Sequence, residues 1–126
     1  MSKVLLDTDV LIEVLRGREK AKVFLRAITR DAVPCCSVIS VAEICAGMYP
    51  EEQDTTFALL DALLLFPVTR QIAEIAGQLK RGTKSHKLEL ADCLIAATAL
   101  VEGASLATGN IKDYPMKEIT ILPFRR

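Results

Sequence analysis

The chain has 126 residues and no net formal charge at pH 7, because 16 Lys and Arg residues balance 16 Asp and Glu residues. About half of it is hydrophobic, yet no stretch reaches the roughly 18 to 20 uninterrupted apolar residues of a membrane span. The length predicts one domain over residues 1–126, and the balanced charge argues against nucleic-acid binding by the whole-molecule field while leaving room for a local basic patch.

The cysteines favour a reducing compartment. There are four, at Cys35, Cys36, Cys45 and Cys93, all in apolar surroundings and none in a CxxC pair. Buried reduced thiols therefore fit better than a zinc site. The first residues enter an apolar run without a signal-peptide pattern, so we expect a cytoplasmic protein with no membrane association.

Short apolar runs alternate with helical patterns along the whole chain. The runs that predict strands are residues 3–6, 33–39, 65–68, 105–108 and 119–122. The segments with helical spacing are 9–17, 19–29, 40–49, 55–65, 71–82 and 89–103. Because the strand runs are continuously apolar, this order predicts the α/β class: a three-layer α/β/α sandwich around a mostly parallel sheet.

Four acidic residues follow strands or stand near the start of helices. Asp7 comes directly after the first strand, Glu43 and Asp92 lie early in helices, and Asp113 lies in the turn after residues 105–108. The carboxyl ends of parallel strands meet at one edge, where open α/β sheets bind ligands. We therefore expect the four carboxylates to converge there.

Each acid also has a purely structural interpretation. Asp7 or Asp9 suits a helix N-cap, and Glu43 has capping-box spacing from Ser40. Asp92 suits the positive end of a helix dipole, and Asp113 suits a turn. Together, however, four converging carboxylates would repel one another, and a divalent cation relieves that repulsion. Hard oxygen ligands favour Mg²⁺ or Mn²⁺, which activates water and holds phosphate oxygens during displacement.

The ordered motifs resemble a known family. DTDVLIE at Asp7, SVAEI at Ser40 and Glu43, ADCLIAATAL at Asp92, and ATGNIKDY at Asp113 together resemble the PIN domain, and more narrowly the VapC toxins of prokaryotic toxin–antitoxin pairs. The resemblance covers nearly the whole chain. It implies a Mg²⁺- or Mn²⁺-dependent endoribonuclease that leaves 3′-hydroxyl and 5′-phosphate ends.

The resemblance also assigns roles by position. It makes Asp7, Glu43, Asp92 and Asp113 the metal-site acids, places the hydroxyls of Thr8 and Thr108 near the metal, and lets Asn110 shape the last loop. It implies an RNA substrate, a small VapB-like antitoxin bound across an apolar surface, and a homodimer.

Three positions depart from the usual pattern of the family. Asp9 stands where many relatives have Ser or Asn, so it is either a fifth acid of the site, a helix cap or a tuning residue. Tyr114 replaces the usual Phe, and Gly109 adds conformational freedom to the loop before Asp113. None of the three removes a required carboxylate.

Basic residues offer contacts to an RNA backbone, although a solvated surface explains each of them equally well. The candidates are Arg70, Lys80, Arg81, Lys84 and Lys87. His86, the only histidine, stands among lysines and makes a poor catalytic base. Three other functions compete: a haloacid-dehalogenase-like phosphatase with Asp7 as nucleophile, a phosphate-accepting receiver domain, and a catalytically silent partner-binding PIN domain.

Overall fold

The computed structural model describes residues 1–84 and 87–126, so His86 lies outside the described residues. The strands are β1 (Ser2–Leu6), β2 (Ala32–Ser37), β3 (Leu64–Phe66), β4 (Ser105–Thr108) and β5 (Ile121–Pro123). The α-helices are α1 (Thr8–Leu15), α2 (Glu19–Asp31), α3 (Val38–Ala46), α4 (Gln53–Asp61), α5 (Arg70–Gly82) and α6 (Leu90–Glu102). Two short 3₁₀ helices, η1 (Pro50–Glu52) and η2 (Ile111–Asp113), precede α4 and follow β4.

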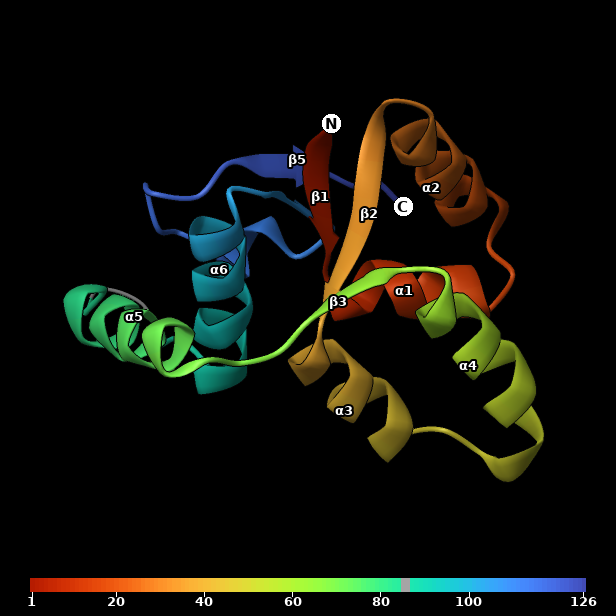
Figure 1. The fold of residues 1–126 in the computed structure, drawn as a ribbon, viewed down its shortest axis with the longest axis horizontal. Coiled ribbons are helices and arrows are strands. Elements are labelled where there is room, and N and C mark those ends of the chain that lie inside the picture. Colours follow the sequence, from red (N-terminus) through yellow and green to blue (C-terminus); the bar gives the residue numbers. More distant parts are fainter. Residues whose placement is uncertain (85–86) are drawn as a thin grey trace.

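The strands form one sheet in the order β3-β2-β1-β4-β5, and every neighbouring pair is parallel. The earliest strand is therefore central, and the chain winds outward from it in both directions (Figure 1). All carboxyl ends of the strands lie along one edge, as the continuous apolar runs predicted.

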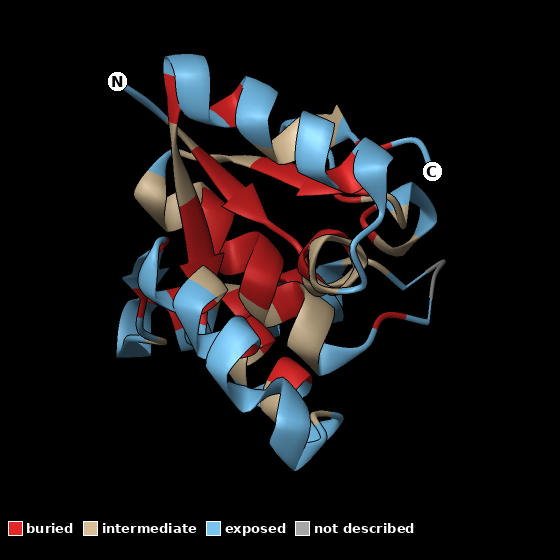
Figure 2. Ribbon diagram, turned by 90° about the vertical axis from the view of Figure 1, so that its right-hand side faces the viewer, coloured by how far each residue is buried: buried red, intermediate tan, exposed pale blue. Residues whose placement is uncertain are grey.

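Helices cover both faces of the sheet. On one face, Leu5 packs into a core cluster with α5 and α6 residues such as Ile72 and Ala96. On the other, Val4 and Leu6 join a second cluster with residues of α1, α2, α3 and α4. Successive side chains of a strand point to opposite faces, so one short strand supplies both cores. The three-layer α/β/α sandwich is confirmed, with the buried residues on the sheet and on the inner sides of the helices (Figure 2).

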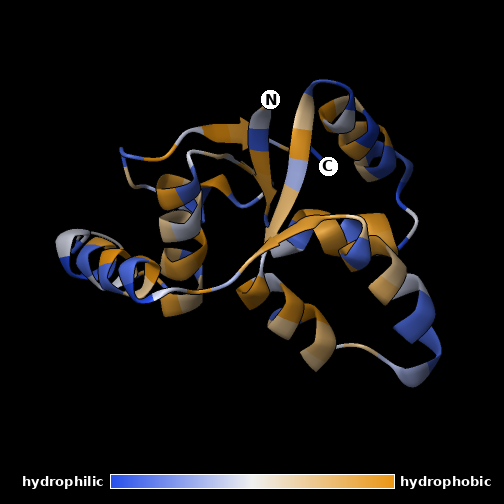
Figure 3. Ribbon diagram, viewed as in Figure 1, coloured by the Kyte–Doolittle hydropathy of each residue, from blue (hydrophilic) through white to orange (hydrophobic). Residues whose placement is uncertain are grey.

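The hydropathy of the chain follows this layering. Strand residues are predominantly apolar, whereas α2 and α5 carry polar residues along their outer surfaces (Figure 3). Within the described part of the chain, none of the helices combines the length and apolar character needed to cross a bilayer.

The start of α3 corrects one prediction from the sequence. The second strand ends at Ser37, not at residue 39, and Ser37 is the N-cap, whose side chain accepts a hydrogen bond from the Ile39 amide at 3.0 Å. The capping box assigned to Ser40 and Glu43 is therefore wrong. Both residues lie inside the helix, and Glu43 is therefore not part of its N-terminal cap.

Candidate active site

The four predicted acids lie at the carboxyl edge of the sheet, each on a different element. Asp7 follows β1, Glu43 lies in α3, Asp92 lies in the first turn of α6, and Asp113 ends η2 after β4. The negative charges of Asp113 and Glu43 both raise the pKa of Asp92, so these three carboxylates lie close enough to interact electrostatically. The topology thus brings together residues that are far apart in the sequence.

Asp7 is the most deeply buried of the four acids. It is only 5% exposed, and its Oδ1 accepts the Thr8 amide at 2.8 Å while its Oδ2 accepts the Thr108 hydroxyl at 2.7 Å. Burial raises the pKa of Asp7 to about 6, against these stabilising hydrogen bonds. Asp7 is also the N-cap of α1, so the capping and the site interpretations hold for the same side chain.

Glu43 is attached to Thr8 across the gap between α1 and α3. The Thr8 hydroxyl lies 2.6 Å from Glu43 Oε1 and 2.8 Å from Ser40 Oγ. A hydroxyl has a single proton, and a charged carboxylate is the stronger acceptor. Ser40, which is fully buried, therefore completes a network that orients Thr8 and through it Glu43.

Asp92 has a neighbour, Tyr114, that the sequence marked only as a replacement for Phe and to which it assigned no role in the site. The Tyr114 hydroxyl donates to Asp92 Oδ1 at 3.3 Å, and Tyr114 is only 3% exposed. Burial, followed by the charge of Asp113, raises the pKa of Asp92 to about 6. Burial also raises the pKa of the Tyr114 phenol, with the charges of Asp7 and Asp92 adding to the effect, so the hydroxyl keeps its proton.

The loop after β4 presents Thr108 and Asp113 to the site. The Thr108 hydroxyl donates to Asp7 and accepts the Asn110 amide at 3.0 Å, while the Asp113 amide donates to the Asn110 carbonyl at 3.0 Å. These bonds form the 3₁₀ turn that follows the strand. Asn110 thus shapes the loop through its backbone.

Asp9 is held by contacts of its own, and its charge adds to the effect of burial in raising the pKa of Asp7. Its Oδ2 accepts the Gly109 amide at 2.9 Å and pairs with the Arg126 guanidinium at 2.8 Å, while its buried Oδ1 has no hydrogen-bond partner among residues 1–84 and 87–126. Asp9 therefore ties α1 to the Gly109 loop and to Arg126, which also pairs with Glu13 at 3.4 Å.

The glycine at position 109 is required by space. Its backbone does not adopt a positive φ, so the extra conformational freedom inferred from the sequence is not used. A Cβ on Gly109 would instead lie 2.8 Å from Asp9 Oδ2 and 3.2 Å from the Phe124 carbonyl oxygen.

The donor set suits a hard divalent cation. Its members are carboxylates, and burial raises the pKa of two of them, Asp7 and Asp92. Raised pKa values are common at functional sites, because the negative charge is unfavourable there until a partner binds. Over residues 1–84 and 87–126, no group of three or more Asp, Glu, His or Cys side chains is arranged so that it could hold a metal ion. Carboxylate oxygens of Asp7, Glu43 and Asp92 instead accept hydrogen bonds from Thr108, Thr8 and Tyr114. A carboxylate has about four acceptor positions, so these bonds leave room for a cation.

The five basic candidates differ in how they are engaged. Arg70 pairs with Glu74 at 3.1 Å, and Lys80 donates to the Leu88 carbonyl at 2.6 Å, which ties α5 to the segment before α6. Arg81, Lys84 and Lys87 are exposed. RNA contact by any of the five stays a prediction.

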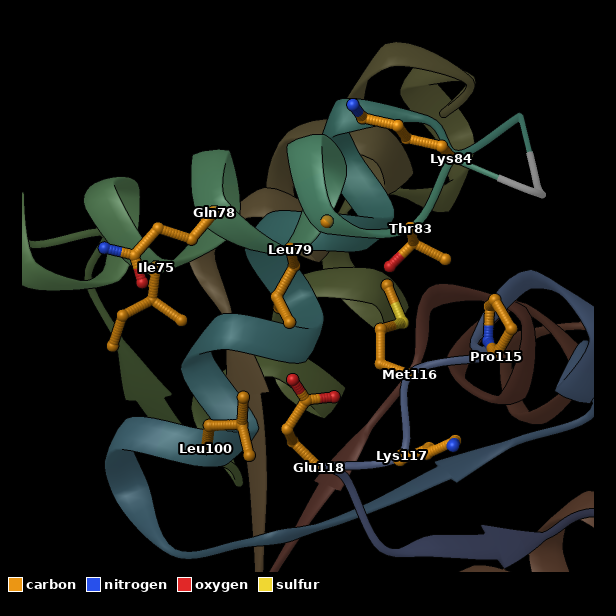
Figure 4. A pocket seen from close by; sticks show the side chains of 11 residues that line it. Ile75, Gln78, Leu79, Thr83, Lys84, Leu100, Pro115, Met116, Lys117 and Glu118 are labelled. Carbon is orange, nitrogen blue, oxygen red and sulfur yellow. The ribbon is translucent and has the colours of Figure 1, made fainter.

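A cavity of about 720 Å³ lies between α5, α6 and residues 115–118. Its walls include Ile75, Leu79, Leu100 and Met116 (Figure 4). Leu100 stands at the far end of α6 from Asp92, eight residues or about 12 Å along the helix axis. None of the four acids lines this cavity, so it is distinct from the candidate active site.

Comparison with known proteins gives consistent matches. The PIN domain model matches residues 4–117. Ribonuclease VapC10 of Mycobacterium tuberculosis is 40% identical over 123 residues, which cover 96% of this chain and 92% of that protein. A toxin–antitoxin complex from Klebsiella pneumoniae contains a chain of 30% identity with a TM-score of 0.82, covering 98% of both chains. A VapBC2 structure from Rickettsia felis, at 20% identity and a TM-score of 0.88 over 98% of this chain and 99% of that chain, shows the same fold.

The raised pKa of Asp7 predicts a specific pH dependence of stability. The pKa is about 6 in the folded protein against an ordinary value of 3.8, so folding favours the protonated form. The resulting stabilisation is complete below about pH 4 and is lost as the pH rises through about 6. Relative to Asp7→Asn, which does not titrate, the wild type should therefore lose thermal stability across this interval. Melting temperatures of both proteins in chelator-treated buffer measure this, and a difference that stays constant with pH would contradict it.

Proposed function

Because the chain belongs to the PIN domain family, we propose that it is a ribonuclease and the toxin of a toxin–antitoxin pair. The observation that carries this proposal is the set of four acids at one edge of the sheet, two of them with raised pKa values. The 40% identity to Ribonuclease VapC10 over nearly the whole chain supports it. Family membership also sets aside the phosphatase with a nucleophilic Asp7 and the receiver domain.

We propose that Asp7, Glu43, Asp92 and Asp113 hold Mg²⁺ or Mn²⁺. When bound, such a cation lowers the pKa of a water molecule and offsets negative charge on the scissile phosphate. The chain itself fixes the acids: Thr108 and the Thr8 amide hold Asp7, and the Thr8 hydroxyl holds Glu43. Pre-oriented carboxylates need little reorganisation when the substrate arrives.

Replacing Asp92 by Asn should abolish divalent-dependent RNA cleavage and leave the fold intact. The amide removes one negative charge from the site but keeps the shape of the side chain. Activity should fall by at least about 100-fold, in the range seen when a key electrostatic group is removed. Sequencing of RNA ends after controlled expression measures this.

The matched control is Asp31→Asn, an exposed acid at the carboxyl end of α2, immediately before β2 and thus at the opposite edge of the sheet. It should cleave like the wild type. Identical cleavage ends from the wild type and Asp92→Asn would overturn the nuclease proposal and favour a catalytically silent binding domain.

We further propose that the antitoxin docks in a groove that begins at Glu43. The groove has a volume of about 340 Å³, and its walls include Ile12, Leu15, Ile44 and Met48 beside that acid. An apolar segment of the antitoxin lying there would bury these side chains and block the site at the same time. Toxin–antitoxin complexes among the related structures support this partner.

A charge placed in this groove should weaken antitoxin binding. Met48→Glu would bury an unpaired carboxylate under the partner, and we expect at least about a tenfold rise in Kd. Binding to a small VapB-like antitoxin co-expressed with this chain can be measured by titration calorimetry. Val23→Glu, at a side chain 51% exposed on α2, is the control. If Val23→Glu loses binding and Met48→Glu keeps it, the antitoxin binds at α2 and not in the groove beside Glu43.

We also propose that the chain forms a homodimer through the β3 edge of the sheet. Leu64 and Leu65 are 44% and 40% exposed on this edge strand, and unprotected apolar edges favour association. Leu65→Lys should shift the protein toward the monomer in sedimentation equilibrium. A wild type that is monomeric at micromolar concentration would contradict the proposal.

A further inference from the structure

Tyr114 is the residue whose hydroxyl contacts Asp92, one of the active-site acids. It follows η2, where its amide donates to the Ile111 carbonyl at 3.0 Å, and its side chain belongs to the core cluster on the α5–α6 face of the sheet. With only 3% of the residue exposed, the ring is enclosed by packed neighbours. The hydroxyl at the end of that ring is therefore held in one place.

The polar end of Tyr114 faces carboxylates. Its hydroxyl donates to Asp92 Oδ1 at 3.3 Å, and the charge of Asp7 also acts on the phenol and raises its pKa. A phenol has one proton and donates to one acceptor at a time. The acceptor in this structure is Asp92, at a distance longer than the usual value of about 2.8 Å.

This placement differs from that of an ordinary core tyrosine. A buried phenol needs one hydrogen-bond partner, and a backbone carbonyl would satisfy it. Here the acceptor is an acid of the candidate site, Asp92 in α6, and the charge of Asp7 after β1 also acts on the phenol. A neutral donor holds the Asp92 carboxylate without adding a positive charge that would compete with a cation.

We propose that Tyr114 is a positioning residue that uses its hydroxyl to orient Asp92 for a divalent cation. The inference rests on the proposed function, because it assigns Tyr114 to the same metal site. Hydrogen-bond partners of metal ligands fix the orientation of those ligands, and their removal typically costs about 10- to 100-fold in metal affinity or activity. The hydrogen bond to Asp92 is long, so we expect the lower end of this range.

The test is the variant Tyr114→Phe, which removes the hydroxyl and keeps the ring in the core. Titration calorimetry with Mn²⁺ alone should give a Kd about tenfold higher than that of the wild type. In the cleavage assay at saturating cation, kcat should fall while the KM for RNA stays unchanged. An unchanged Kd for Mn²⁺ in a folded Tyr114→Phe protein would overturn the inference.

A spectroscopic signal tests the same point without altering Tyr114. The chain has no Trp and only two Tyr residues, and the other, Tyr49, is 67% exposed. In Tyr49→Phe, near-ultraviolet tyrosine absorbance therefore reports Tyr114 alone. Adding Mg²⁺ should shift this absorbance as the hydrogen bond to Asp92 changes, and Tyr114→Phe should show no shift.

The outcomes separate this inference from the function on which it rests. A wild type that binds Mn²⁺ and cleaves RNA, with a Tyr114→Phe variant of equal affinity and a Tyr49→Phe variant without a spectral shift, would overturn only the role of Tyr114. A wild type that binds no divalent cation would overturn both.

Discussion

The repulsion between carboxylates collected at one edge of a parallel sheet is the constraint on which the rest of this site depends. The topology leaves no alternative: β1 is central, β2 and β4 flank it, and the segments after all three strands emerge at the same edge. Acids on those segments are therefore near neighbours wherever they lie in the sequence. Burial raises the pKa of Asp7 and of Asp92 to about 6; the charges of Asp113 and Glu43 add to the effect on Asp92, and the charge of Asp9 adds to the effect on Asp7.

Neutral hydrogen-bond donors hold these carboxylates in place. Thr108 donates to Asp7, Thr8 to Glu43 and Tyr114 to Asp92, so three acids are each held by a hydroxyl from another segment of the chain. The guanidinium of Arg126 pairs with Asp9 and Glu13, which are not among the four acids. This division leaves the central carboxylates anchored and still negatively charged as a group, which is what a divalent cation requires.

The fold and the placement of the four acids at one edge could be predicted from the sequence, whereas their role in a metal site stays a prediction. Continuous apolar strands alternating with amphipathic helices specify a parallel sheet. Asp7, Glu43 and Asp113 follow β1, β2 and β4, and Asp92 reaches the same edge in the first turn of α6. The helix limits were less predictable, since Ser37 and Ser40 are both suitable caps and only packing decides that α3 begins at Val38. Tyr114 was noted only as a replacement for Phe, because the contact of its hydroxyl with Asp92 joins positions 22 residues apart through the tertiary structure. The environment of Asp9 depends likewise on Arg126, which is 117 residues away in the chain.

Anomalous scattering from crystals soaked in Mn²⁺ shows whether these carboxylates share a divalent cation. We expect one or two anomalous peaks with Asp7 and Asp92 carboxylate oxygens about 2 to 2.5 Å away, the range of metal–oxygen bonds for hard cations. The same soak of Asp92→Asn crystals should show a weaker peak or none. If no peak appears at this edge of the sheet, at an Mn²⁺ concentration that supports RNA cleavage in solution, then the carboxylates do not share a cation.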